Sequence, residues 1–82
     1  MNKKPLYILI SIDPDNGEKT PVFASFALNQ TKLHLFSLYK EYYGEVENID
    51  IKKLSMKEKI IKAEELIGNG NYEIIDINNY KL

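Results

Sequence analysis

The chain has 82 residues, of which 44% are hydrophobic and 28% are charged, and its net charge is −1 at pH 7. These values predict one small globular domain spanning residues 1–82. Because the sequence has no cysteine, disulfides, thiolate metal sites and cysteine nucleophiles are excluded. All eleven basic residues are lysines, which excludes the bidentate arginine contacts that read guanine edges and phosphates.

The N-terminus resembles a signal peptide only in outline. Two lysines precede an apolar run, but this run ends at Asp13, and no cleavage site of small residues follows closely. No stretch approaches the roughly 18 apolar residues of a membrane span. We therefore expect a cytoplasmic protein.

The most strongly strand-forming stretch is Leu6–Ile12, which consists almost entirely of β-branched, aromatic and large aliphatic residues. Successive side chains of a strand face opposite sides of a sheet. We expect a central strand with helices over its aliphatic face, so that its mixed face is solvated or free for binding. The aliphatic face comprises Leu6, Ile8, Ile10 and Ile12, and the mixed face comprises Tyr7, Leu9 and Ser11.

Residues 13–20 combine Asp, Pro, Asn and Gly, which favour turns. Pro21–Leu28 is read as a second strand, and the two strands are expected to form an antiparallel hairpin with a long loop. In this pairing, Phe23, Ser25 and Ala27 continue the mixed face.

Asn29–Tyr43 is predicted to be the first helix, because at 100° per residue its large apolar side chains gather on one arc. Asn29 or Thr31 is expected to be the N-cap, and Gly44 stands where a C-terminal glycine belongs. Glu45–Ile51 is expected to form a short strand. Its apolar positions are Val46, Ile49 and Ile51.

The second helix should begin at Ser55, because Ser55 and Glu58 form the pattern of a capping box. It should end at Gly68, and Tyr72–Ile77 is read as the last strand, followed by a frayed tail over 78–82. The predicted fold class is α+β with the element order ββαβαβ. We expect a two-layer sandwich of two helices on a mixed or mostly antiparallel sheet of about four strands.

The loop after the first strand opens like a calcium-binding loop, with Asp13 and Asp15 two positions apart. A calcium loop of this type needs a ligand at position 5, glycine at position 6 and glutamate at position 12. Those positions hold Gly17, Glu18 and Ala24. The pattern therefore predicts a polar turn and no metal site.

His34, Ser37 and Glu41 lie on one face of the first predicted helix and have the residue types of a catalytic triad. Working triads draw their members from different elements and need an oxyanion hole, so we expect a solvated polar stripe instead. The four glycines form no phosphate-binding loop, and a single histidine excludes a multi-histidine metal site. We expect no catalytic residue and no cofactor, and hence no enzyme.

A tyrosine cluster in the first predicted helix, followed by an acidic segment, is the most suggestive local feature. Tyrosine is enriched in protein interfaces, and acidic neighbours would suit a partner with a basic groove. The alternative is that the tyrosines pack the helix on the sheet. With two aromatic residues of the mixed strand face, the predicted partner-binding residues are Tyr39, Tyr42, Tyr43, Glu45, Glu47, Tyr7 and Phe23.

These patterns predict a small non-enzymatic module that binds another protein. Frequent Lys, Asn, Ile and Tyr in place of Arg indicate an AT-rich genome, so a phage or mobile-element inhibitor or regulator of a host protein, such as a host-defence antagonist, is the concrete version. A homo-oligomer that binds a small ligand at a subunit interface is the first alternative. A weak nucleic-acid binder is the second, although interspersed glutamates argue against it. Its basic residues would be Lys52, Lys53, Lys57, Lys59 and Lys62.

Overall fold

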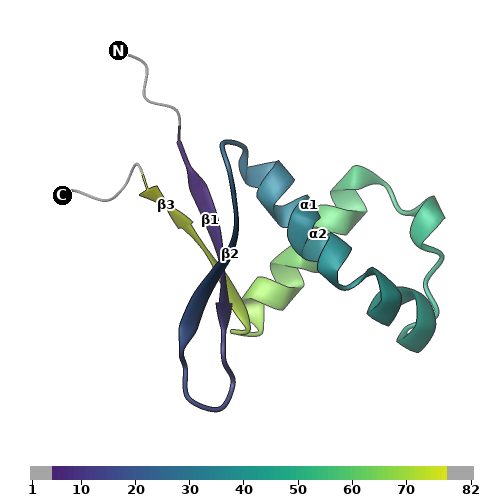
Figure 1. The fold of residues 1–82 in the computed structure, drawn as a ribbon. Helices are drawn as coiled ribbons and strands as arrows, with labels where there is room; N and C mark the ends of the chain where they lie inside the picture. The colour runs from purple at the N-terminus through teal and green to yellow at the C-terminus, as the bar shows by residue number, and fades with distance from the viewer. Residues whose placement is uncertain (1–4, 78–82) are drawn as a thin grey trace.

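The computed structural model describes residues 5–77 (Figure 1). The frayed tail predicted over 78–82 lies outside these residues. In chain order the elements are β1 (Tyr7–Ile12), β2 (Lys19–Ser25), α1 (Leu28–Leu38), the π-helical turn η1 (Tyr42–Val46), the 3-10 turn η2 (Ile51–Lys53), α2 (Met56–Gly68) and β3 (Tyr72–Asp76).

The three strands form an antiparallel sheet in the order β2-β1-β3. The predictions of an α+β fold, of a central first strand and of an antiparallel hairpin are therefore confirmed. A bulge interrupts the hairpin, because Leu9 pairs with Phe23 whereas Ile10 pairs with Pro21, which leaves Val22 as the extra residue of β2.

The fourth strand expected over Glu45–Ile51 is not formed, so the described order is β1-β2-α1-η1-η2-α2-β3. Asn48 has a φ of 57°, a left-handed conformation that interrupts an extended run. The apolar residues of this stretch act as packing anchors instead. Ile49 and Ile51 pack against the core, whereas Val46 is exposed.

Helices α1 and α2 lie on one side of the sheet (Figure 1), and they cover the mixed face of β1. Leu9 is fully buried and shares the core with Leu35 and Phe36 of α1 and with Ala63 of α2. The prediction that the helices cover the aliphatic face is therefore wrong. Aliphatic content alone did not select the buried face.

Aromatic side chains of the mixed face explain why the helices lie there. Phe23 of β2 stacks on His34 of α1, with ring centroids 3.8 Å apart. On the other outer strand, the hydroxyl of Tyr72 lies 3.2 Å from the hydroxyl of Tyr39, just after α1. These contacts fix α1 to both edges of the sheet.

Helix α1 begins without the predicted cap. Its N-cap is Ala27 rather than Asn29 or Thr31, and no side chain caps it. Thr31 is buried instead, and its hydroxyl donates a hydrogen bond to the carbonyl of Ala27 at 3.1 Å. The α-helix also ends at Leu38, earlier than expected, because the chain changes to the π-helical turn η1.

Helix α2 begins as predicted. The Ser55 hydroxyl accepts a hydrogen bond from the Glu58 N–H at 3.2 Å, and the Glu58 carboxylate accepts one from the Ser55 N–H at 3.5 Å. The helix ends at Gly68, also as predicted, and packs on α1 and β3. Neither α1 nor α2, the two long helices of residues 5–77, has the length and apolar character needed to cross a membrane.

Candidate functional site

The chain after α1 makes a wide turn that separates buried from exposed tyrosines. The Glu47 N–H donates to the carbonyl of Tyr42, five residues earlier, at 3.3 Å. This bond defines a π-helical turn, a rare conformation that is frequent at functional sites. The Ile49 N–H then donates to the carbonyl of Tyr43 at 3.0 Å, and the left-handed Asn48 ends the turn.

Tyr43 anchors this turn in the core. It is only 4% exposed and stacks on Phe36, with ring centroids 5.4 Å apart. The ammonium group of Lys62 lies 5.5 Å from the Tyr43 ring centroid, a cation–π contact. Burial raises the pKa of Tyr43, and the carboxylates of Glu47 and Glu65 raise it further. Tyr43 is therefore a neutral packing group at physiological pH.

The outer side of the turn is apolar and acidic. Tyr42 is 47% exposed, Val46 is 69% exposed, and Leu38, four residues before Tyr42, is 52% exposed. Leu38 and Val46 are eight positions apart in the chain, so these side chains belong to one short segment. Its charged residues are one lysine and three glutamates, a net charge of −2, all exposed. We call this surface the η1 surface. Its members are Leu38, Glu41, Tyr42, Glu45, Val46 and Glu47.

Tyr39 connects the η1 surface to the sheet. Its ring lies 6.4 Å from those of Tyr42 and Tyr43, and its hydroxyl meets that of Tyr72. Burial raises the pKa of Tyr39 to about 12, with further contributions from the hydrogen bond and charge of Tyr72. The tyrosines thus form one aromatic cluster from the turn to β3.

The structure brings together five of the seven residues predicted to bind a partner and separates the other two. The rings of Tyr39, Tyr42 and Tyr43 are in contact, and Glu45 and Glu47 follow on the same turn. Tyr42 and the two glutamates are exposed. The remaining two belong to the helix-covered face of the sheet. Phe23 is stacked on His34, and Tyr7 lines a cleft.

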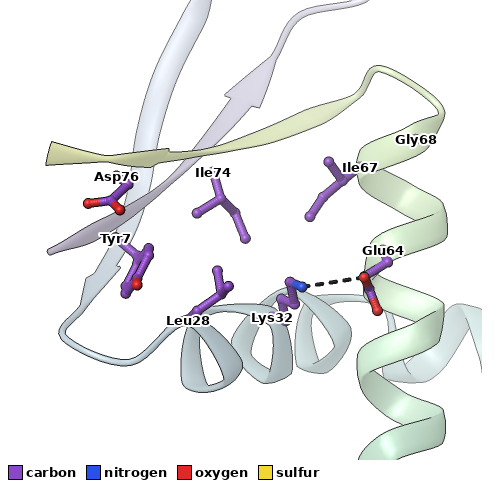
Figure 2. Close-up of a pocket in the computed structure, with 8 residues that line it drawn as sticks. All are labelled: Tyr7, Leu28, Lys32, Glu64, Ile67, Gly68, Ile74 and Asp76. Atoms are coloured by element: carbon purple, nitrogen blue, oxygen red, sulfur yellow. Dashed lines mark ion pairs between the residues drawn. The ribbon is translucent and has the colours of Figure 1, made fainter. Parts of the chain in front are cut away.

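This cleft lies between the sheet and the two helices, and Figure 2 shows its side chains. Its volume is about 580 Å³, within the roughly 300–1,000 Å³ of small-molecule sites. Lys32 of α1 and Glu64 of α2 form an ion pair at 3.4 Å across it. The lining residues are Tyr7, Leu28, Lys32, Glu64, Ile67, Gly68, Ile74 and Asp76.

The residues considered for catalysis or metal binding make local contacts. The Ser37 hydroxyl donates to the carbonyl of His34 at 2.6 Å, and the Asp13 carboxylate accepts from the Asp15 N–H at 2.8 Å. In the described part of the chain, no three His, Cys, Asp or Glu side chains gather to hold a metal ion.

Two lysines of the predicted basic patch lie over aromatic rings of the core. Lys62 contacts Tyr43, as described above, and the Lys59 ammonium group lies 6.0 Å from the Phe36 ring centroid. These side chains cover the aromatic core with their apolar stems, which gives them a packing role.

Several residues of these surfaces were missed from the sequence. Leu38 and Val46 were missed because a π-helical turn has no clear compositional signal. Lys32 and Glu64 of the cleft had a weak signal, since a lysine in the first turns of a helix opposes the helix dipole and calls for a nearby acidic partner.

Comparison with protein-family models, with curated proteins and with solved structures found no match to this chain.

Proposed function

We propose that this chain is a non-enzymatic protein-binding module whose partner contacts the η1 surface. The observation that supports this most strongly is the exposure of three large apolar side chains, Leu38, Tyr42 and Val46, on one short segment. Single exposed apolar residues are ordinary, but a group of them bordered by charges is typical of interaction sites.

The chemistry of the η1 surface favours one kind of partner. Tyr42 is a suitable anchor, because tyrosine is enriched among residues that dominate binding energy. Its ring makes T-shaped contacts with Tyr39 and Tyr43 at 6.4 and 5.6 Å, so little side-chain freedom is left to lose on binding. The three flanking glutamates favour a partner whose apolar groove has a basic rim.

More specifically, we propose that the chain is a phage or mobile-element protein that inhibits or regulates a host protein, for example in host defence. The support is compositional: eleven lysines and no arginine indicate an AT-rich genome. By occupying a basic groove, the module would block whatever acidic ligand the host protein normally binds there.

The test compares two glutamate substitutions at exposed apolar positions. Val46→Glu alters the η1 surface, whereas Ile61→Glu alters α2 at a residue that is 46% exposed. Both variants should keep the unfolding free energy within about 0.5 kcal/mol of the natural chain. In pull-downs from a lysate of a low-GC bacterium, we expect a specific protein that is captured by the natural chain and by Ile61→Glu but lost with Val46→Glu. Equal capture by both variants would rule out the η1 surface.

The cleft supports a second candidate function, the binding of a small ligand. Its volume and its ion pair between Lys32 and Glu64 suit a small molecule with an apolar body and a polar end. Fragment screening by NMR tests this directly. Binding should shift the resonances of Tyr7 and Ile74 together, and Ile74→Ala should weaken it; shifts confined to other residues would exclude the cleft.

A further inference from the structure

The face of the sheet opposite the helices is apolar and has no helix over it in the described chain (Figure 1). In an antiparallel sheet, residues directly opposite each other share a face. Ile8 pairs with Ala24 and with Ile75, and the Ile77 N–H donates to the carbonyl of Leu6. We call this surface the open face. Its apolar residues are Leu6, Ile8, Ile10, Ile12, Val22, Ala24, Ile75 and Ile77.

One ion pair crosses the open face. Lys19 of β2 pairs in register with Ile12, and Glu73 of β3 pairs with Ile10. The Lys19 ammonium and the Glu73 carboxylate lie 3.0 Å apart, so the two side chains reach toward each other from the outer strands over the central strand. This accounts for Ile10 being only 8% exposed. The charges on the face thus sum to zero and sit at one end.

We infer that a second copy of this chain covers the open face, related by a two-fold axis parallel to β1. Such an axis places β2 of each copy over β3 of the other. Each Lys19 then lies about 7 Å along the strand from the other copy's Glu73, within reach of a lysine side chain. Two ion pairs become one network of four alternating charges, and the isoleucines pack against each other as in a β-sandwich.

An axis perpendicular to the strands would give the opposite electrostatics. Centred on Ile10, it would place Glu73 of one copy over Glu73 of the other and would move Lys19 over Ala24. Like charges would then face each other, and each lysine would keep only the Glu73 of its own chain as a partner and gain none from the other copy. The arrangement of charge on the open face therefore selects one dimer geometry.

The dimer is expected to be weak. Three strands about 4.8 Å apart and six residues long at about 3.3 Å each cover roughly 300 Å² in projection. A standard interface buries about 800 Å² on each partner. We therefore expect reversible association with a dissociation constant weaker than about 1 μM.

Sedimentation equilibrium of the full chain over a wide range of concentrations measures this association. The average mass should rise from that of one chain toward that of two. Val22→Glu, at a position 45% exposed on the open face, should abolish the rise, whereas Val46→Glu on the η1 surface should preserve it. A single-chain mass at millimolar concentration, or a rise that only Val46→Glu abolishes, would overturn the proposal.

Charge reversal at Lys19 and at Glu73 tests the geometry of the dimer with two variants, so that the result does not depend on a single substitution. Lys19→Glu gives the open face two acidic residues, and Glu73→Lys gives it two basic residues, so each variant alone should remain monomeric. An equimolar mixture should form a heterodimer that associates at least as strongly as the natural chain. If each variant is folded by circular dichroism and the mixture stays monomeric, the two-fold axis parallel to β1 is wrong. Neither reversal alters the η1 surface. Partner capture in pull-downs and self-association through the open face can therefore be tested independently.

Discussion

The hydroxyl groups of Tyr39 and Tyr72 lie 3.2 Å apart and join the end of α1 to β3 across 33 positions of the sequence. Tyr39 also contacts the rings of Tyr42 and Tyr43. One pair of phenols therefore ties the sheet to the segment that carries the η1 surface. Loss of this contact should loosen the surface as well as the core.

Alkaline pH should destabilise the fold through Tyr39. A tyrosine of the unfolded chain titrates near pH 10, whereas burial and the Tyr72 contact raise the pKa of Tyr39 to about 12. Between these values the unfolded chain loses the proton that the folded chain keeps. Stabilisation that is fully present below pH 10 is thus lost as pH rises toward 12. Urea unfolding between about pH 8 and about pH 11 measures the decline.

Tyr39→Phe should reduce that alkaline decline, because the group with the raised pKa is removed. At neutral pH the variant should lose about 0.5–1.5 kcal/mol, the net worth of a typical hydrogen bond. Some alkaline loss should persist, since burial also raises the pKa of Tyr43. An unchanged decline in the variant would show that Tyr39 does not cause it.

Alanine substitutions at Leu35 and Leu38 compare the inner and outer sides of α1. Leu35 is fully buried, whereas Leu38 belongs to the exposed η1 surface. We expect Leu35→Ala to lower the unfolding free energy by about 2–5 kcal/mol and Leu38→Ala to change it by less than about 0.5 kcal/mol. Similar losses in urea unfolding would contradict the orientation of α1.

The capping box of α2 should be measurable with a serine control. Ser55→Ala removes the hydroxyl that accepts from the Glu58 N–H and should cost about 1 kcal/mol. Ser37→Ala removes an exposed hydroxyl that bonds only within its own helix and should cost less than about 0.5 kcal/mol. Thermal unfolding compares the two, and an equal effect would mean that the cap contributes little.

Two neighbouring glycines should respond to alanine with opposite signs. A Cβ on Gly68 would meet no atom within 4 Å, and Gly68 lacks a positive φ. Gly68→Ala should therefore stabilise the chain by about 0.5–1 kcal/mol, because the unfolded state loses freedom. Gly70 has a φ of 85°, so Gly70→Ala should destabilise by about 1–2 kcal/mol. Calorimetric unfolding would detect both, and two changes of the same sign would contradict this backbone.

Structural features that are determined by residues close together in the sequence could be predicted. The run Leu6–Ile12 marks a strand through β-branched and aliphatic residues alone, and its length suits a central position. The capping box of α2 is equally local, since Ser55 and Glu58 are three residues apart. The α+β class followed from these elements, because both helices and all three strands were anticipated.

The choice of covered face was not predictable, because distant contacts decide it. The aliphatic face of β1 is the more hydrophobic one, yet Phe23 meets His34 and Tyr72 meets Tyr39 on the other. No single segment contains both partners of either contact. Two residues of the η1 surface, Leu38 and Val46, were missed for a local reason. At Glu47 the backbone hydrogen bond spans five residues instead of four, and this change of helix type has no hydrophobic periodicity that a sequence pattern could reveal.

The bulge in β2 also affects whether another chain can add a strand to the sheet. Its outer edge carries Lys19, Pro21 and the extra residue Val22, and charge, a missing N–H and a bulge each oppose pairing with a new strand. The outer strand β3, Tyr72–Asp76, carries the charges of Glu73 and Asp76 but has neither a proline nor a bulge. Strand addition through β3 can join two chains, and both ends of such a pair are then β2 edges. Growth of the sheet by this route therefore stops at two chains, because the bulge and the proline of β2 oppose the addition of a further strand.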